Sequence, residues 1–224
     1  MHSKIVKRTA ALLPHRWQQE LRRITYRGQI AREAFRTSEP EWELASRWLA
    51  PGDWAIDVGA NIGHYTKRFS DIVGALGRVF AFEPVPATFD LLASNVARFE
   101  NSNVTLLNLA ASESTQVLGM VVPKFDTGLR DYYSAQLTTA PEALQVATIA
   151  LDSLALEGPV KLLKIDAEGH DGLVIAGARS LIARYRPTII VETVTTAAVA
   201  FLEAVGYRSQ VLPGSPNRVF AAAG

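Results

Sequence analysis

From residue 54 onward, the hydrophobic pattern of the chain alternates between two periods. Short apolar runs, which are typical of strands buried on both faces, are followed by longer stretches in which apolar residues recur at helical spacing. Strands that alternate with helices are joined by right-handed crossovers and form a mainly parallel sheet. The pattern predicts strands at 54–58, 78–82, 103–109, 160–165, 188–192 and near 217–222, and helices at 64–73, 86–99, 171–184 and 195–205.

The alternation is interrupted after the third predicted strand. Residues 116–123 and 145–149 have the pattern of strands, and the segment between them, Lys124–Glu142, is polar and aromatic. Cations and flat rings in such a segment suit sugar faces and anionic groups. We therefore expect residues 113–150 to form a small insertion, a hairpin over the sheet edge, that binds an acceptor substrate.

A different pattern precedes these elements. In residues 12–36, apolar side chains recur at helical spacing among basic ones, which predicts one or two basic amphipathic helices. The pattern breaks at Pro40, and a further helix is expected at 42–49. The break divides the chain into a basic helical extension, residues 1–40, and a main domain, residues 41–224.

The composition is that of one sizeable domain, because 224 residues with 48% hydrophobic content suffice for a well-buried core. No apolar run approaches the ~20 residues of a membrane span, and no secretion signal is recognisable, so we expect a cytoplasmic protein. Cysteine is absent. Its absence excludes disulfides, thiolate zinc sites, cysteine-ligated iron–sulfur clusters and cysteine nucleophiles.

The overall charge of +1 conceals an asymmetry. Residues 1–36 carry nine Lys and Arg against Glu20 and Glu33, a net charge of +7, so the rest of the chain carries −6. A basic segment on an acidic body is typical of contact with an anionic partner, such as a membrane surface, a nucleotide-sugar or nucleic acid. The alternative is a solvated helix beside the domain. Contact with the inner face of a membrane is therefore left open.

The segment from Asp57 to Gly63 carries the main functional signal. An apolar strand ends on Asp57 and leads into a turn with glycines at 59 and 63, followed by a predicted helix. Glycine lets the backbone N–H groups of such a turn approach a ligand closely. Glu83 ends the next strand 20 positions after Gly63, near the ~20-residue spacing at which a carboxylate binds a ribose diol. These features predict a nucleoside-containing cofactor.

The glycine spacing favours one nucleoside cofactor over another. A dinucleotide-binding turn reads G-x-G-x-x-G, whereas Asn61 stands at the place of the middle glycine and no G-K-[ST] phosphate loop occurs. S-adenosylmethionine (SAM) carries no phosphate. It needs an acid near its amino group, backbone contact along its methionine tail and a carboxylate for its ribose. Asp57, the turn and Glu83 can supply these three.

Several motifs, in their order and spacing, resemble those of the FkbM-type SAM-dependent methyltransferases. They are Asp57–Gly63, Phe82–Pro84, Leu151–Leu154, Lys164–Gly169 and Gly177-Ala178. The resemblance implies a class I methyltransferase fold, which is α/β and Rossmann-like, with a mainly parallel seven-stranded sheet and helices on both faces. It also implies transfer of a methyl group from SAM to a hydroxyl oxygen of a small molecule or of a glycan- or lipid-linked sugar.

The resemblance implies roles for individual residues as well. The expected cofactor-binding residues are Asp57, Gly59, Ala60, Asn61, Gly63, Glu83, Pro84, Asn108, Ala110 and Asp166. Ala110 stands where many related methyltransferases place an acid that reads the adenine amino group. Adenine recognition must then come from the backbone, from Asn108 or from Ser112. Asp171 stands where the family usually has Glu.

The candidate catalytic residues follow the predicted strand 160–165. They are Asp166, Glu168 and His170. One of them would remove the proton of the acceptor hydroxyl. Asp166 has the strand-tip position and the family match, while His170 has the most suitable ordinary pKa, ~6.5. In the alternative reading both only begin the following helix. Lys164 lies on the same strand face as Asp166 and can pair with it.

The ends of the predicted strands also place Glu192 at the rim that holds Asp57, Glu83 and Asp166, since parallel strands end at one edge. The acids near residue 166 could hold Mg²⁺, but hard-ligand sites have no strict spacing. We favour catalysis without a metal.

Three other functions compete with O-methylation. A nucleic-acid or protein methyltransferase would share the SAM site, but the Asn/Asp-Pro-Pro-aromatic segment of amine-methylating enzymes is missing, since Asp166–Gly169 stands in its place. Ribose methylation is harder to dismiss. An NAD-dependent oxidoreductase would need the missing glycine. A non-catalytic SAM-binding module would leave the acids at 166–171 without a purpose.

Overall fold

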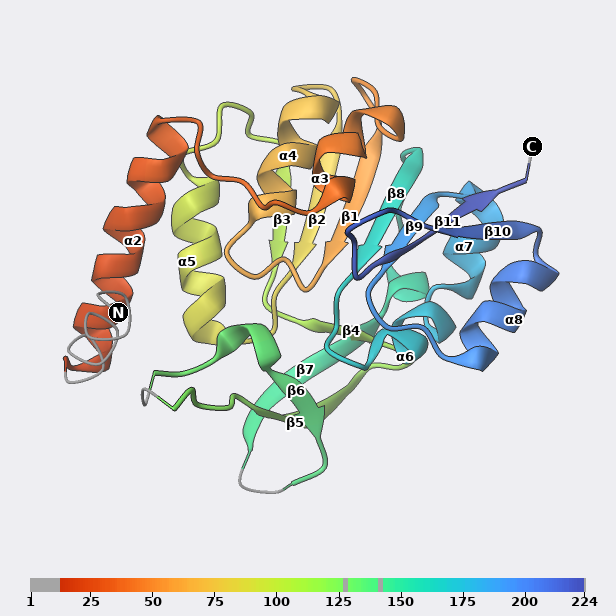
Figure 1. Ribbon diagram of the computed structural model, residues 1–224. Helices are drawn as coiled ribbons and strands as arrows, with labels where there is room; N and C mark the ends of the chain where they lie inside the picture. The colour runs from red at the N-terminus through yellow and green to blue at the C-terminus, as the bar shows by residue number, and fades with distance from the viewer. Residues whose placement is uncertain (1–12, 127–128, 141–142, 224) are drawn as a thin grey trace.

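The computed structural model describes residues 13–126, 129–140 and 143–223, apart from the side chains of His15 and Tyr133. The strands of its main sheet are β1 (Trp54–Val58), β2 (Arg78–Phe82), β3 (Val104–Leu107), β8 (Val160–Ile165), β9 (Thr188–Val191), β10 (Tyr207–Val211) and β11 (Arg218–Ala222). They lie in the order β3-β2-β1-β8-β9-β11-β10 (Figure 1). Neighbours are parallel, except that β11 is antiparallel to β9 and β10. The predicted seven-stranded, mainly parallel α/β fold is confirmed.

Helices cover the main sheet on both faces (Figure 1). They are α2 (His15–Ala31), α3 (Pro40–Leu44), α4 (His64–Val73), α5 (Pro86–Val96), α6 (Asp171–Ala176), α7 (Arg179–Tyr185) and α8 (Thr196–Ala204), with 3-10 turns η1 (Ala45–Arg47), η2 (Tyr132–Ser134) and η3 (Leu151–Ser153). Helix α2 packs along the outer side of α5. Within the described ranges, no helix combines the length and the apolar character needed to cross a bilayer.

The sheet is buried on both faces because successive strand residues point to opposite sides. Ile56 and Leu163 join an apolar cluster that includes side chains of α6, α7 and α8. Their neighbours Ala55 and Leu162 join a second cluster with Phe69 of α4. Burial on both sides explains why the strand segments read as continuous apolar runs.

The predicted insertion is a second sheet and not a simple hairpin. Its strands are β4 (Ala110–Ser112), β5 (Gln116–Val121), β6 (Gln136–Thr138) and β7 (Leu144–Ala150), in the order β4-β7-β5-β6. The predicted strand 103–109 was therefore too long. Strand β3 ends at Leu107. The side-chain amide of the next residue, Asn108, donates hydrogen bonds to the backbone oxygens of Glu83 (2.8 Å) and Pro84 (3.1 Å).

Two other predictions need correction. The single helix expected at 171–184 is two helices, because Gly177 packs against β4 so closely that a Cβ atom would lie 2.0 Å from the Ser112 carbonyl oxygen. Strand β10 was not predicted, since only Tyr207 of its five residues is buried and the pattern lacks apolar alternation. The boundary at residues 40 and 41 stays a prediction.

Candidate functional site

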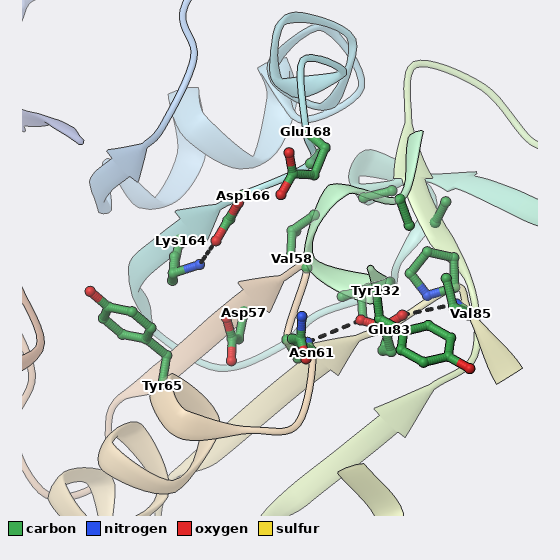
Figure 2. A pocket seen from close by; sticks show the side chains of 18 of the residues that line it. Asp57, Val58, Asn61, Tyr65, Glu83, Val85, Tyr132, Lys164, Asp166 and Glu168 are labelled. Atoms are coloured by element: carbon green, nitrogen blue, oxygen red, sulfur yellow. Dashed lines mark hydrogen bonds and ion pairs between the residues drawn. The ribbon is translucent and has the colours of Figure 1, made fainter. Parts of the chain in front are cut away.

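A cavity of about 510 Å³ lies at the carboxyl ends of β1, β2 and β8, between the main sheet and the second sheet (Figure 2). This volume is within the range of small-molecule sites, ~300–1,000 Å³. Asp57, Glu83 and Asp166 all line it, because parallel strands end at one edge. The other predicted residues that line it are Gly59, Ala60, Asn61, Pro84, Ala110 and Glu168.

Asp57 is fully buried at the end of β1. Its Oδ2 accepts a hydrogen bond of 2.6 Å from the Thr66 hydroxyl of α4, whereas Oδ1 has no partner among the described residues. Burial raises the pKa of Asp57, although Lys164 and Thr66 oppose this shift. A buried acceptor without a partner beside a cavity is costly unless a ligand donates to it. A ligand ammonium group would satisfy it.

The turn after β1 is held by hydrogen bonds from its own amides to the end of β2 and to Glu83. The amide N–H groups of Gly59 and Ala60 both donate to the Phe82 carbonyl, at 3.0 and 2.9 Å, and the Asn61 N–H donates to Glu83. These three amides therefore do not point to a ligand as the sequence suggested. The turn offers a ligand close backbone approach, but the Gly59, Ala60 and Asn61 N–H groups are already used, which does not suit a phosphate.

Gly59 and Asn61 give the turn its shape. Both have positive φ, +74° and +49°, the left-handed region that glycine and asparagine tolerate best. A Cβ atom on Gly59 would lie 1.9 Å from the Asp166 carbonyl oxygen, so only glycine allows β1 and β8 to end this close together. Gly63, also at positive φ, is the N-cap residue of α4 and packs against Leu92 outside the cavity.

The Glu83 carboxylate bridges two loops at the end of β2 (Figure 2). Oε2 accepts from the Asn61 N–H at 3.0 Å and Oε1 accepts from the Val85 N–H at 2.9 Å. Burial raises the pKa of Glu83 to about 7, although these two hydrogen bonds oppose it. Each carboxylate oxygen retains a lone pair, so Glu83 can still accept from a ligand hydroxyl.

The buried Lys164 and the half-buried Asp166 form an ion pair at the end of β8, with Nζ 2.9 Å from Oδ2 (Figure 2), as their alternation predicted. Burial alone would lower the pKa of Lys164, but the carboxylates of Asp166 and Asp57 outweigh it and raise that pKa. Burial would raise the pKa of Asp166, but Lys164 and a hydrogen bond with Glu192 outweigh it and lower that pKa. Asp166 is therefore ionised and already partnered.

Glu168 stands above this pair and lines the cavity (Figure 2). Its backbone is left-handed, with φ +51°. Partial burial, together with the charges of Asp166 and Asp171, raises the pKa of Glu168 to about 7. A carboxylate with that pKa can accept a proton near neutral pH.

Glu192 completes an acidic group with Asp166 and Glu168, in which one carboxylate oxygen of each lies within 4.8 Å of the others. Burial and the Asp166 charge raise the pKa of Glu192 to about 7. Three oxygens at this distance could hold a cation, but Lys164 already neutralises Asp166. Catalysis without a metal stays a prediction.

Three other candidates lie away from the cavity lining. The His170 Nε2 atom is 2.9 Å from the Ser112 hydroxyl, so the two side chains hold α6 against β4. The Asp171 carboxylate accepts from the Ala167 and Gly169 N–H groups and fixes the loop before α6. The Asn108 amide bonds to the loop after β2. Each of these polar groups has a structural partner.

The sequence did not point to the segment between α2 and α3. Arg36, Thr37, Ser38 and Glu39 line the cavity, and Glu39 accepts a hydrogen bond of 2.6 Å from the Tyr65 hydroxyl. No local signal could have revealed this, because the contacts join residues 26 positions apart. His64 and Tyr65, at the start of α4, line it as well.

The second sheet supplies the apolar wall of the cavity. Met120, Tyr132 and Leu137 line this wall together with Val85 and Ala110. The acids and Lys164 form a polar wall, which adjoins the apolar one where Glu83 accepts from the Val85 N–H. The arrangement suits a ligand with a flat apolar part and a charged tail.

A sequence model of the methyltransferase FkbM domain matches residues 57–209. The hexuronic acid methyltransferase AglP of Haloferax volcanii is 31% identical over 124 residues, which are 54% of this chain and 48% of that protein. A probable cobalt-precorrin-6B C(15)-methyltransferase of Sulfolobus acidocaldarius is 28% identical over 59% of this chain and 70% of its own length. The chain thus spans about half the length of the first of these curated relatives.

Solved structures agree on the fold. An FkbM methyltransferase from Methylobacillus flagellatus superimposes with a TM-score of 0.54 and 16% identity, over 81% of this chain and 50% of that one. A putative rRNA methylase from Clostridium thermocellum superimposes with a TM-score of 0.51 and 14% identity, over 82% and 94%. The fold is that of class I SAM-dependent methyltransferases, and since the domain match covers more than half of the chain, this protein belongs to the FkbM methyltransferase family.

Proposed function

We propose that this protein transfers a methyl group from SAM to a hydroxyl oxygen of a sugar, either in a glycan or linked to a lipid. The observation that carries the proposal is the cavity itself, which is lined both by Asp57, whose buried Oδ1 has no partner among the described residues, and by the Glu168 carboxyl group. The relative that methylates a hexuronic acid supports a sugar acceptor.

The residues of the polar wall fit SAM. Asp57 would accept from the amino group of the methionine tail, and Glu83 from the ribose hydroxyls. The adenine ring would pack against Val85 and Ala110. SAM, when bound, supplies the activated methyl group, so the protein needs only to orient the acceptor and remove its proton.

Glu168 is the proposed base. It lines the cavity and its pKa is raised to about 7, which matches proton acceptance near neutral pH. Asp166 is held by Lys164 and would orient the acceptor hydroxyl by a hydrogen bond. In this proposal His170 has a structural role, because its contact with Ser112 holds α6 in place.

Two measurements test the proposal. Calorimetric titration with S-adenosylhomocysteine, with NAD as the control, should give binding of the former alone. Incubation with SAM and uronic-acid oligosaccharides should then add one methylene unit to the acceptor mass. Mild alkali separates the products, because it cleaves a methyl ester but leaves a methyl ether. An ester would contradict the hydroxyl acceptor and move methylation to the carboxylate.

We expect Asp57→Asn to weaken S-adenosylhomocysteine binding by roughly 10–150-fold, the equivalent of the ~1.5–3 kcal/mol of a hydrogen bond to a charged group. Asparagine keeps the shape and can still accept from Thr66, so the fold should persist. Asp90→Asn, an exposed change on α5, is the matched control in the same titration. Equal affinity in both variants would remove Asp57 from the cofactor site.

In this proposal, Arg36 favours acceptors that carry a carboxylate group. It is exposed beside the cavity and forms no ion pair with any described residue, so its guanidinium group is available to an acceptor carboxylate. We expect Arg36→Ala to raise the KM for uronic-acid acceptors about two- to fivefold, a modest effect because the site is exposed. The KM for neutral glycosides should stay constant, as should both values in Arg98→Ala. A parallel rise for neutral acceptors would contradict a role in charge recognition.

A further inference from the structure

Helix α2 presents its apolar residues to solvent. Trp17, Leu21 and Ile24 are 54%, 49% and 59% exposed, and their spacing of four and three residues aligns them along one face. Leu13, just before the helix, is also exposed. Trp17, Leu21 and Ile24 are called the outer stripe below. A surface helix normally turns such a stripe toward the core, so its outward direction needs a reason.

The opposite face of α2 is already packed. Tyr26 meets the Phe35 ring edge-on, with centroids 6.0 Å apart, and Ile30 packs on the cluster that contains Leu91. At the border between the two faces, the exposed Arg27 donates to the Ser94 hydroxyl of α5 at 3.3 Å. The helix is therefore docked on α5 (Figure 1), and the outer stripe is what remains after its contacts with the domain are made.

Cations border the outer stripe. Within α2, four arginines stand against the single acid Glu20, and Arg16 and Arg27, which flank the stripe, are exposed. An apolar row with Trp, bordered by Arg, is the arrangement of helices that lie in the interface of an anionic bilayer. A protein partner would require a broader surface, of ~20–30 residues a side, whereas the exposed large apolar residues of α2 form one row.

We propose that α2 lies on an anionic lipid surface, with the outer stripe inserted among the headgroups and acyl chains. Its two exposed arginines, Arg16 and Arg27, would contact the lipid phosphates. The helix would bind to one side of the membrane without crossing it, in agreement with its length and composition.

The same helix is joined to the lining of the cavity. The Arg22 guanidinium lies 5.1 Å above the centre of the Tyr132 ring, and Tyr132 lines the cavity. The segment that follows α2 brings Arg36 and Glu39 to the cavity as well. Docking of α2 would thus hold the acceptor side of the cavity near the membrane. This step rests on the proposed function and narrows its substrate to a lipid-linked sugar.

The test is co-sedimentation of the full chain with vesicles of phosphatidylcholine that contain or lack phosphatidylglycerol. We expect binding to the anionic vesicles, and weaker binding as NaCl concentration rises. The triple variant W17S/L21S/I24S should lower the partition coefficient at least tenfold. The control L76S/V117S/V211S removes three exposed apolar side chains elsewhere and should bind like the unmodified chain.

Three results would overturn the proposal: equal binding to neutral vesicles, equal loss in both triple variants, or a stripe-dependent dimer in analytical ultracentrifugation without vesicle binding. The S-adenosylhomocysteine titration separates this inference from the proposed function. Intact cofactor binding without vesicle binding rejects only the membrane role. Vesicle binding without any methyl transfer to lipid-linked or free sugars rejects the proposed function and leaves the membrane role standing.

Discussion

Replacement of Glu168 by Gln is expected to lower kcat on a hydroxyl acceptor by ~10²–10⁴-fold, the usual contribution of a positioned general base. Glutamine keeps the size of the side chain and the left-handed backbone at this position, but it cannot take a proton. S-adenosylhomocysteine affinity should change little, because no cofactor role is assigned to Glu168. The loss should therefore appear in kcat and not in cofactor binding.

The pH dependence of the rate provides a second test of the role of Glu168. A base works when deprotonated, and the pKa of Glu168 is raised to about 7. The rate of the unmodified enzyme should therefore rise with pH through about 7 and level off above it, and Glu168→Gln should lose that rise. Glu157→Gln, an exposed change before β8, is the control. Loss of the rise in His170→Gln or Glu192→Gln instead would assign the base to that residue, and full activity of Glu168→Gln would indicate an acceptor that is already ionised.

Gly59→Ala is expected to destabilise the fold by about 2–5 kcal/mol. A φ of +74° costs an alanine ~1–2 kcal/mol, and a Cβ atom 1.9 Å from the Asp166 carbonyl oxygen adds an overpacking cost of ~1–3 kcal/mol. For a domain of this size the melting temperature should fall by roughly 5–15 °C. Cofactor binding should weaken too, because β1 and β8 must separate where Asp57 and Asp166 stand.

Gly214→Ala isolates the backbone part of this cost. Gly214 has a similar φ of +79°, but nothing lies within 4 Å of the position of its added Cβ. Thermal denaturation should therefore show a clearly smaller loss in Gly214→Ala than in Gly59→Ala. Equal losses would mean that the strand ends separate without resistance, which contradicts close packing at the turn.

The sequence predicted the main sheet well because its strands are buried on both faces. The bounds expected for β1, β2 and β8 agree with the structure, since continuous apolar runs between turn signals leave little ambiguity. The same logic brought Asp57, Glu83 and Asp166 to one cavity. Prediction was poor where burial was one-sided or absent, as in β10, and where a close approach broke a helical pattern, as at Gly177.

The parts of the site that could not be predicted depend on long-range contacts. That Glu39 meets Tyr65, or that Ser112 holds His170, follows from how the elements pack and not from any local pattern. The free donors expected in the turn were already used by Phe82 and Glu83. Residue type and spacing show which groups are present, whereas packing decides which of them remain available.

The segment that forms most of the second sheet begins and ends at neighbouring positions in the fold. Ser112 at the end of β4 is paired with Ala150 at the end of β7, so the chain departs and returns across a single strand spacing, about 5 Å. A segment with such adjacent ends can be exchanged as a cassette without a change in the rest of the domain. Replacement of residues 113–149 would therefore change the part of the cavity lining formed by Met120, Tyr132 and Leu137 and leave the ends of β1, β2 and β8 in place.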